Sequence, residues 1–177
     1  RKRGRLMKHS RLLRYLTYLI ELFVLYAVQQ APDLLPTIHN GRPVLLVPLA
    51  ISIALFEPQV ASMMFGVACG LFLDVGYGSG VLGPHAIVLA IVCFVVSYLA
   101  QDLIQTTALN ALLICCLTMG VLVVFQWLLT YVALGQPDQL YALVHHFLPR
   151  FVYTVALTLP VYALNRLFAV HIHPLSD

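Results

Sequence analysis

Residues 56–85 read FEPQVASMMFGVACGLFLDVGYGSGVLGPH, and this stretch decides the fold. Within it, Ser62, Gly66, Gly70 and Asp74 recur at every fourth position, so on a helix they lie along one flank, drifting by about 40° per step. Most of the residues between them are apolar and suit lipid or a protein core. Because small residues at this spacing let two membrane helices approach closely, the pattern predicts a membrane helix that packs tightly through this flank.

A glycine-rich turn follows this helix. Asp74 stands at the helix end, and the turn after it contains small residues, namely Gly76, Gly78, Ser79, Gly80 and Gly83. The free backbone amides of such a turn are donors that a carboxylate can accept from. We therefore expect Asp74 to hold the turn. The flank of small residues together with Asp74 is a candidate surface for helix packing or for a partner.

Composition places the chain in a membrane. Hydrophobic residues make up 61% of its 177 residues and charged residues only 10%, against about 25% charged in an ordinary soluble domain. A soluble chain of this size would lack the polar residues to cover its surface. The mean hydropathy of +0.91 agrees. We expect an integral membrane protein.

Six apolar segments account for the chain and predict an all-α polytopic membrane protein. They cover residues 12–28, 44–55, 60–73, 81–100, 108–134 and 151–170. Crossing about 30 Å of hydrocarbon takes about 20 helical residues, so the second and third segments are short. One alternative is a single broken hairpin over residues 44–73 that does not fully cross. The predicted division is a basic tail at 1–11, a transmembrane domain at 12–170 and a short tail at 171–177.

Two connections carry expectations of their own. The hinge at residues 56–58 separates the second and third segments, and we expect Glu57 there to be solvated at the cytoplasmic side. Residues 141–149 mix His145 and His146 with leucines, which predicts a short interfacial helix before the last span.

The basic residues predict the orientation. Seven of the ten lie between Arg1 and Arg14, and Arg166 follows the last apolar segment, whereas only Arg42 and Arg150 fall in the intervening outer loops. With six spans both termini share one side, and the positive-inside rule makes that side cytoplasmic. We interpret the basic tail as a topological signal, with contact to anionic lipid or nucleic acid as the weaker alternative. The predicted location is the cell (inner) membrane.

The sequence carries no pattern of catalytic or metal-binding residues. Two positions before Ser79 stands Tyr77, where a rhomboid-type intramembrane protease would show glycine, so Ser79 is interpreted as a turn residue. The four cysteines fall inside predicted spans, where cysteine behaves as a small hydrophobe. The histidine pairs have no acidic or thiol partner nearby and are interpreted as interfacial. We expect a protein that is not an enzyme and has no cofactor.

Two polar residues within the spans need a partner. Glu21 lies in the middle of the first segment, where ionisable groups are costly and usually face protein. Three roles remain open for Glu21: a contact with a partner protein, a proton site, or a hydrogen bond to a neighbouring helix. Asn165, next to Arg166, is interpreted as marking the cytoplasmic exit of the last span.

The chain resembles the MreD family, the small membrane subunit of the bacterial rod-shape (elongation) machinery. The resemblance is strongest over residues 32–100 and is carried by Pro32-Asp33, Arg42-Pro43, Phe56-Glu57, Gly66-x-x-x-Gly70-Leu71-x-x-Asp74 and Gly78-Ser79-x-x-x-Gly83. One departure is Pro84-His85, where the family more often shows a polar or basic residue.

This resemblance implies a scaffold. MreD-like proteins act with the bitopic membrane protein MreC, the actin homologue MreB, the wall polymerase RodA and its class B penicillin-binding protein. Partners expected for this chain are therefore an MreC-like protein, that wall-elongation assembly and membrane lipids, with self-association possible and no nucleic acid.

The family is also similar in fold to the S components of energy-coupling-factor vitamin transporters. The alternative function is therefore capture of a vitamin in an outward pocket, which requires convergent polar groups on the outer side. The outer loops offer few such groups, so the scaffold is favoured.

Overall fold

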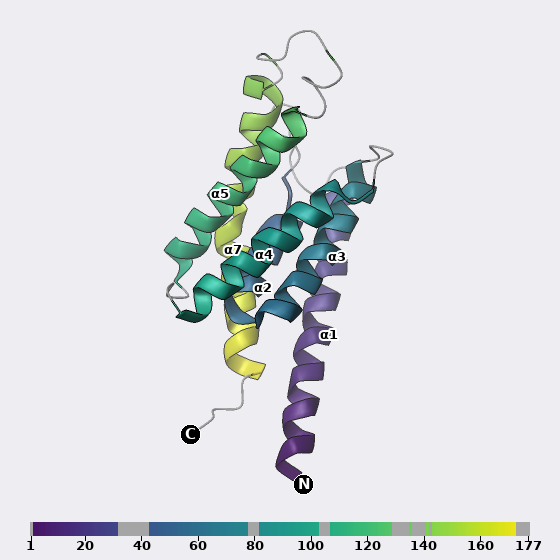
Figure 1. Ribbon diagram of the computed structural model, residues 1–177, viewed down its shortest axis with the longest axis vertical. Coiled ribbons are helices and arrows are strands. Elements are labelled where there is room, and N and C mark those ends of the chain that lie inside the picture. The colour runs from purple at the N-terminus through teal and green to yellow at the C-terminus, as the bar shows by residue number, and fades with distance from the viewer. Residues whose placement is uncertain are drawn as a thin grey trace.

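The computed structural model describes residues 2–31, 43–77, 82–102, 107–128, 135, 141 and 143–172 of the chain. The described part is all-helical, which confirms the predicted fold class. Its helices are α1 (Lys2–Gln30), α2 (Leu46–Phe56), α3 (Gln59–Tyr77), α4 (Pro84–Asp102), α5 (Ala108–Trp127), the π-helical turn η2 (Leu143–Phe147) and α7 (Leu148–Ile172). The start of α1 and the end of α7 lie at the same end of the bundle (Figure 1).

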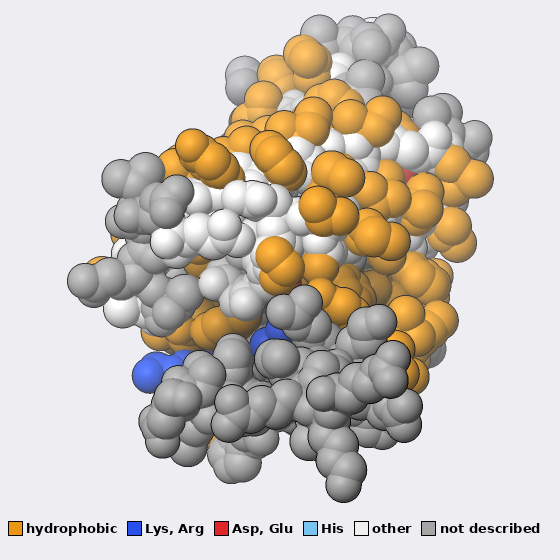
Figure 2. Space-filling view, turned by 60° about the horizontal axis from the view of Figure 1, so that its bottom comes forward, with side chains coloured by type: hydrophobic (Ala, Val, Ile, Leu, Met, Phe, Trp, Pro, Cys, Tyr) orange, Lys and Arg blue, Asp and Glu red, His pale blue; other side chains and the backbone are white. Residues whose placement is uncertain are grey.

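Among the described residues, five helices are long and apolar enough to cross a membrane: α1, α3, α4, α5 and the continuous η2–α7 segment. The remaining helix, α2, has only 11 residues and so is about 17 Å long, well short of the hydrocarbon thickness. The large hydrophobic side chains that these helices expose suit contact with lipid. Figure 2 shows such side chains spread over the described part of one face.

The short helix α2 is the centre of the bundle. Every residue from Leu46 to Leu55 is buried, and α1, α3, α4, α5 and α7 all pack against it. A helix that is apolar on every side is suited to such burial. The hydrophobic core accordingly includes Leu46, Leu49, Ile51 and Ile53, all without exposed surface.

Side chains of two other helices bind the backbone just before α2. The Val44 amide donates to Thr154 Oγ1 of α7 at 3.0 Å, and the Leu45 amide donates to Gln29 Oε1 of α1 at 2.9 Å. Backbone amides before and at a helix start have no partner within the helix, and in an apolar medium an unpaired amide is costly. Gln29 and Thr154 therefore fix the position at which the central helix begins.

At the other end of α2, the expectation of a solvated Glu57 is wrong. Glu57 is 3% exposed and forms an ion pair with Arg14 of α1, with Nε 2.7 Å from Oε1 and Nη2 donating to Oε2 at 3.2 Å. Ser97 Oγ of α4 donates to the Glu57 carbonyl at 2.6 Å. The hinge is therefore bound to both α1 and α4, and the Glu57 carboxylate is buried rather than exposed to water.

The chain before the last span also differs from expectation. In place of a separate interfacial helix, one π-helical turn at Leu143–Phe147 runs directly into α7. Pro149 does not break α7, since proline is tolerated in the first turn, where an amide has no helical partner. The predicted end of the fifth span, residues 129–134, lies outside the described residues.

The ion pair at the hinge gives a first prediction. Glu57→Leu should lower the free energy of unfolding by about 3–5 kcal/mol, because it leaves the Arg14 charge buried without its partner. The double variant Arg14→Leu/Glu57→Leu should recover most of that loss. Thermal unfolding in detergent measures both effects.

The control is Gln59→Ala, which removes an exposed side-chain hydrogen bond to Gln101 between α3 and α4 and should change stability by less than about 0.5 kcal/mol. A Glu57→Leu protein as stable as the wild type would contradict the structural importance of the pair.

Candidate functional site

The flank of small residues on α3 lies against α4. Ser62 Oγ donates to the Cys93 carbonyl at 3.0 Å. A Cβ added at Gly66 would lie 2.8 Å from the Leu89 carbonyl oxygen, and one at Gly70 would lie 2.3 Å from the Ala86 Cα. Both distances are shorter than real side chains show, so only glycine allows the two backbones to approach this closely.

Asp74 links the end of α3 to the start of α4. Its side chain is buried and accepts hydrogen bonds from the Gly83 amide at Oδ2 (2.8 Å) and from the His85 amide at Oδ1 (3.3 Å). These amides lie at the start of α4, where no helical acceptor exists. Gly83 has φ of +119°, a conformation that favours glycine.

The remaining turn residues are only partly described. Gly76 packs against α1, since a Cβ there would lie 2.8 Å from Nε2 of the Gln30 side chain. Gly78, Ser79 and Gly80 lie outside the described residues.

His85 is a site residue that the sequence reasoning did not identify. It is 7% exposed, and its Nδ1 lies 2.6 Å from Asp74 Oδ1. The available signal was the departure Pro84-His85, which places a titratable ring where α4 begins. Next to it lies a pocket of about 10 Å³ that also includes Gln126 and Arg150, which is room for about one water molecule.

A second buried polar pair joins α1 to α7. Asn165 Nδ2 donates to Glu21 Oε1 at 3.0 Å, and both side chains are buried. The interpretation of Asn165 as a marker of the cytoplasmic exit is therefore wrong. Asn165 lies on the inner face of α7 and is buried, whereas the next residue, Arg166, lies on another face of the helix and is exposed.

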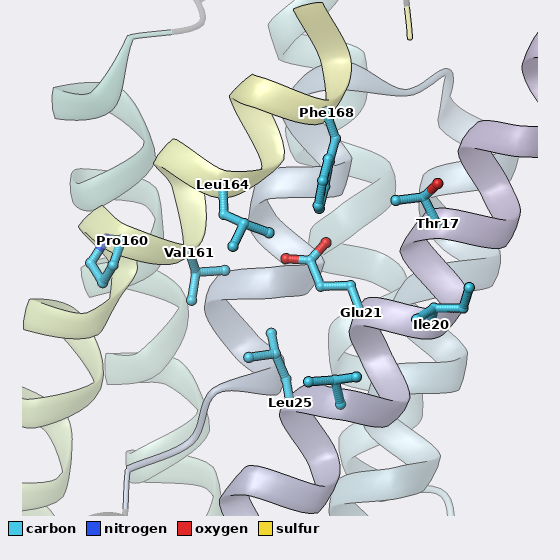
Figure 3. A pocket seen from close by; sticks show the side chains of 9 residues that line it. Thr17, Ile20, Glu21, Leu25, Pro160, Val161, Leu164 and Phe168 are labelled. Atoms are coloured by element: carbon cyan, nitrogen blue, oxygen red, sulfur yellow. The ribbon is translucent and has the colours of Figure 1, made fainter. Parts of the chain in front are cut away.

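These polar residues form separate contacts, each joining two helices. Ser62 and Asp74 bind α4, Glu21 binds α7, and Glu57 binds α1. Glu21 also lines a groove between α1 and α7 (Figure 3). Of the candidate residues, Glu21 is thus the one that borders a pocket large enough for another group.

Helix content, apolar surface and internal polar pairs define an all-helical, multi-pass membrane protein. A family model described as rod shape-determining protein MreD matches residues 9–168. Because the match covers most of the 177 residues, the chain belongs to the MreD family of rod shape-determining membrane proteins. The resemblance carried by residues 32–100 is thereby confirmed. Comparison with curated proteins and with solved structures gives no match, and the likeness to S components stays a prediction.

The close contact of α3 and α4 gives a second prediction. Gly70→Ala should destabilise the protein by about 1–3 kcal/mol, because the new methyl group meets the α4 backbone and forces the helices apart. Thermal unfolding in detergent measures the loss. The matched control is Gly120→Ala on α5, where an added Cβ meets nothing within 4 Å. If the two variants are equally stable, the packing of α3 on α4 is not as close as described.

The Asp74 contacts give a third prediction. Asp74→Ala leaves the Gly83 and His85 amides without their acceptor, so the start of α4 should exchange amide hydrogens faster. Asp74→Asn keeps one acceptor oxygen and should give an intermediate rate. Hydrogen exchange read by mass spectrometry on peptides from the start of α4 tests this, and peptides from α5 provide the reference. Unchanged exchange in Asp74→Ala would contradict the role.

Proposed function

We propose that this chain is a non-enzymatic scaffold subunit of the wall-elongation complex. In this role it binds an MreC-like bitopic membrane protein and helps to organise or regulate peptidoglycan synthesis by RodA and a class B penicillin-binding protein, alongside MreB. The observation that carries the proposal is the family match over residues 9–168. The buried polar groups support a non-enzymatic role, because Ser62, Glu57 and Asp74 are used in contacts that hold helices of the bundle together.

We further propose that both termini are cytoplasmic and that residues 12–170 form the domain within the cell membrane. The start of α1 and the end of α7 share one end of the bundle (Figure 1). Most of the basic residues belong to that end, which the positive-inside rule assigns to the cytoplasm.

The pockets formed by the described residues do not favour vitamin capture. An S component needs a polar pocket of several hundred Å³ at its outer end. At the end opposite the termini, the pocket beside His85 and Arg150 holds about 10 Å³. Two larger grooves, of about 430 Å³ between α1 and α7 and about 550 Å³ between α5 and α7, are lined mostly by apolar side chains and suit apolar groups rather than a water-soluble vitamin.

A fourth prediction tests the function. The tagged protein, isolated in mild detergent from its own cells, should bring with it a bitopic MreC-like protein, identified by mass spectrometry. A thermal-shift screen with water-soluble vitamins should give no concentration-dependent rise, since a ligand bound to the folded state would stabilise it by mass action. Recovery of an ATPase pair with a coupling subunit, or a shift of several degrees with one vitamin, would overturn the scaffold.

A fifth prediction tests the orientation. Reporter fusions after residues 35 and 137 should be extracytoplasmic, and fusions after residue 104 and at the carboxyl end should be cytoplasmic. A cytoplasmic signal after residue 137 would contradict six crossings and would favour a hairpin at 44–73 that does not cross.

A further inference from the structure

A groove of about 430 Å³ runs between α1 and α7 on the flank of the bundle (Figure 3). Its lining is aliphatic or aromatic except for two residues, and it consists of Thr17, Ile20, Glu21, Val24, Leu25, Pro160, Val161, Leu164 and Phe168. The Thr17 hydroxyl is already used, since it donates to the Leu13 carbonyl at 2.9 Å. Glu21 is therefore the polar group that the groove presents.

The Glu21 side chain points into this groove with one oxygen unpaired. The residue is 8% exposed, its Oε1 accepts from Asn165, and its Oε2 has no hydrogen-bond partner. Asn165 Oδ1 also lacks a partner, because the amide nitrogen is the atom that binds Glu21 and the Val161 carbonyl. Both oxygens are buried acceptors without a donor, and each unpaired buried group is costly. The missing component is a hydrogen-bond donor.

The depth of Glu21 in the membrane limits which molecules can supply that donor. The apolar part of α1 spans Leu12–Gln30, and Glu21 lies nine residues from either end, which is about 14 Å along the helix. This places the carboxyl near the middle of about 30 Å of hydrocarbon. Lipid headgroups lie at the surface and acyl chains carry no donor, so a lipid in the groove would leave both oxygens unpaired. A polar side chain on a transmembrane helix brings a donor to this depth.

A second copy of the chain does not supply the donor. In a symmetric contact the same groove of a second copy would face this one, and its exposed lining residues Ile20, Val24 and Leu164 are aliphatic. A transmembrane helix of another protein fits better. The groove rim matches such an occupant, because Ile20, Val24 and Leu164 are 53%, 54% and 43% exposed and would be covered by it.

We propose that the groove between α1 and α7 is the docking site for one transmembrane helix of a different membrane protein, which carries a hydrogen-bond donor side chain near its midpoint that pairs with Glu21. This proposal rests on the proposed scaffold function, whose bitopic partner has one such helix. It adds the site, the depth and the chemistry of the contact.

Photo-crosslinking tests the location. A benzophenone amino acid is placed at Val24 on the groove rim and, as controls of comparable exposure, at Leu117 on α5 and at Ile91 on α4, in full-length protein co-expressed with the bitopic partner. The Val24 probe should link to the partner's transmembrane segment, and the two controls should not. Links from Val24 only to lipid or to a second copy of this chain would overturn the proposal.

Substitution tests the chemistry. Glu21→Leu combined with Asn165→Leu removes the polar pair while keeping the site filled with apolar groups, so the fold should stay intact by thermal unfolding. Affinity for the partner should nevertheless fall by about three- to thirtyfold, the range for one interhelical hydrogen bond in a membrane. The control Thr158→Val lies elsewhere on α7. It removes a buried hydrogen bond to Cys115 of α5 and should leave affinity for the partner unchanged.

The two proposals fail in different ways. If the wild-type protein captures no bitopic partner, the scaffold function is wrong. If the wild-type protein captures the partner but the Glu21→Leu/Asn165→Leu variant binds it equally well, the scaffold stands and the groove is not its docking site. If that double variant does not fold, Glu21→Gln serves instead, since its amide keeps the size of the side chain and should lower affinity by a smaller factor than the range above. Unchanged affinity in Glu21→Gln would also overturn the proposal.

Discussion

The burial of α2 is the constraint on which the rest of the structure depends. This 11-residue helix is surrounded by the five longer helices, and every residue from Leu46 to Leu55 is buried. The backbone at its start is bound by Gln29 and Thr154, and the hinge after it by Arg14. A change in the position of α1 or α7 would therefore break a bond at the centre.

The same constraint explains where the polar side chains lie. Each buried polar group in the spans costs free energy unless it is paired, and the pairs join different helices: Ser62 to α4, Asp74 to α4, and Glu21 to α7. Between α3 and α4 the pairing is accompanied by very close backbone packing at Gly66 and Gly70. These helices are held by van der Waals contact and hydrogen bonds, since lipid provides no hydrophobic force between them.

The α1–α7 side of the bundle is less closely packed than the contact of α3 with α4. There the helices are separated by a groove of about 430 Å³, and one carboxyl oxygen within it is unpaired. In a family of rod shape-determining membrane proteins, we propose this groove as the place where a neighbouring protein completes the packing. The other buried carboxyls, Asp74 and Glu57, are occupied by contacts within the chain.

The sequence by itself determined the class, the helices and the family. Composition and apolar run length are sums over local stretches, and the four-residue spacing from Ser62 to Asp74 is a helical repeat, so these properties can be recognised without knowing any contact. The tertiary structure alone decided which side chains pair with one another. Glu21 binds Asn165 at a separation of 144 positions, Glu57 binds Arg14 at a separation of 43, and His85 joins Asp74. A hydrogen bond depends on which helices meet and at what depth, and helix packing fixes that rather than any local pattern.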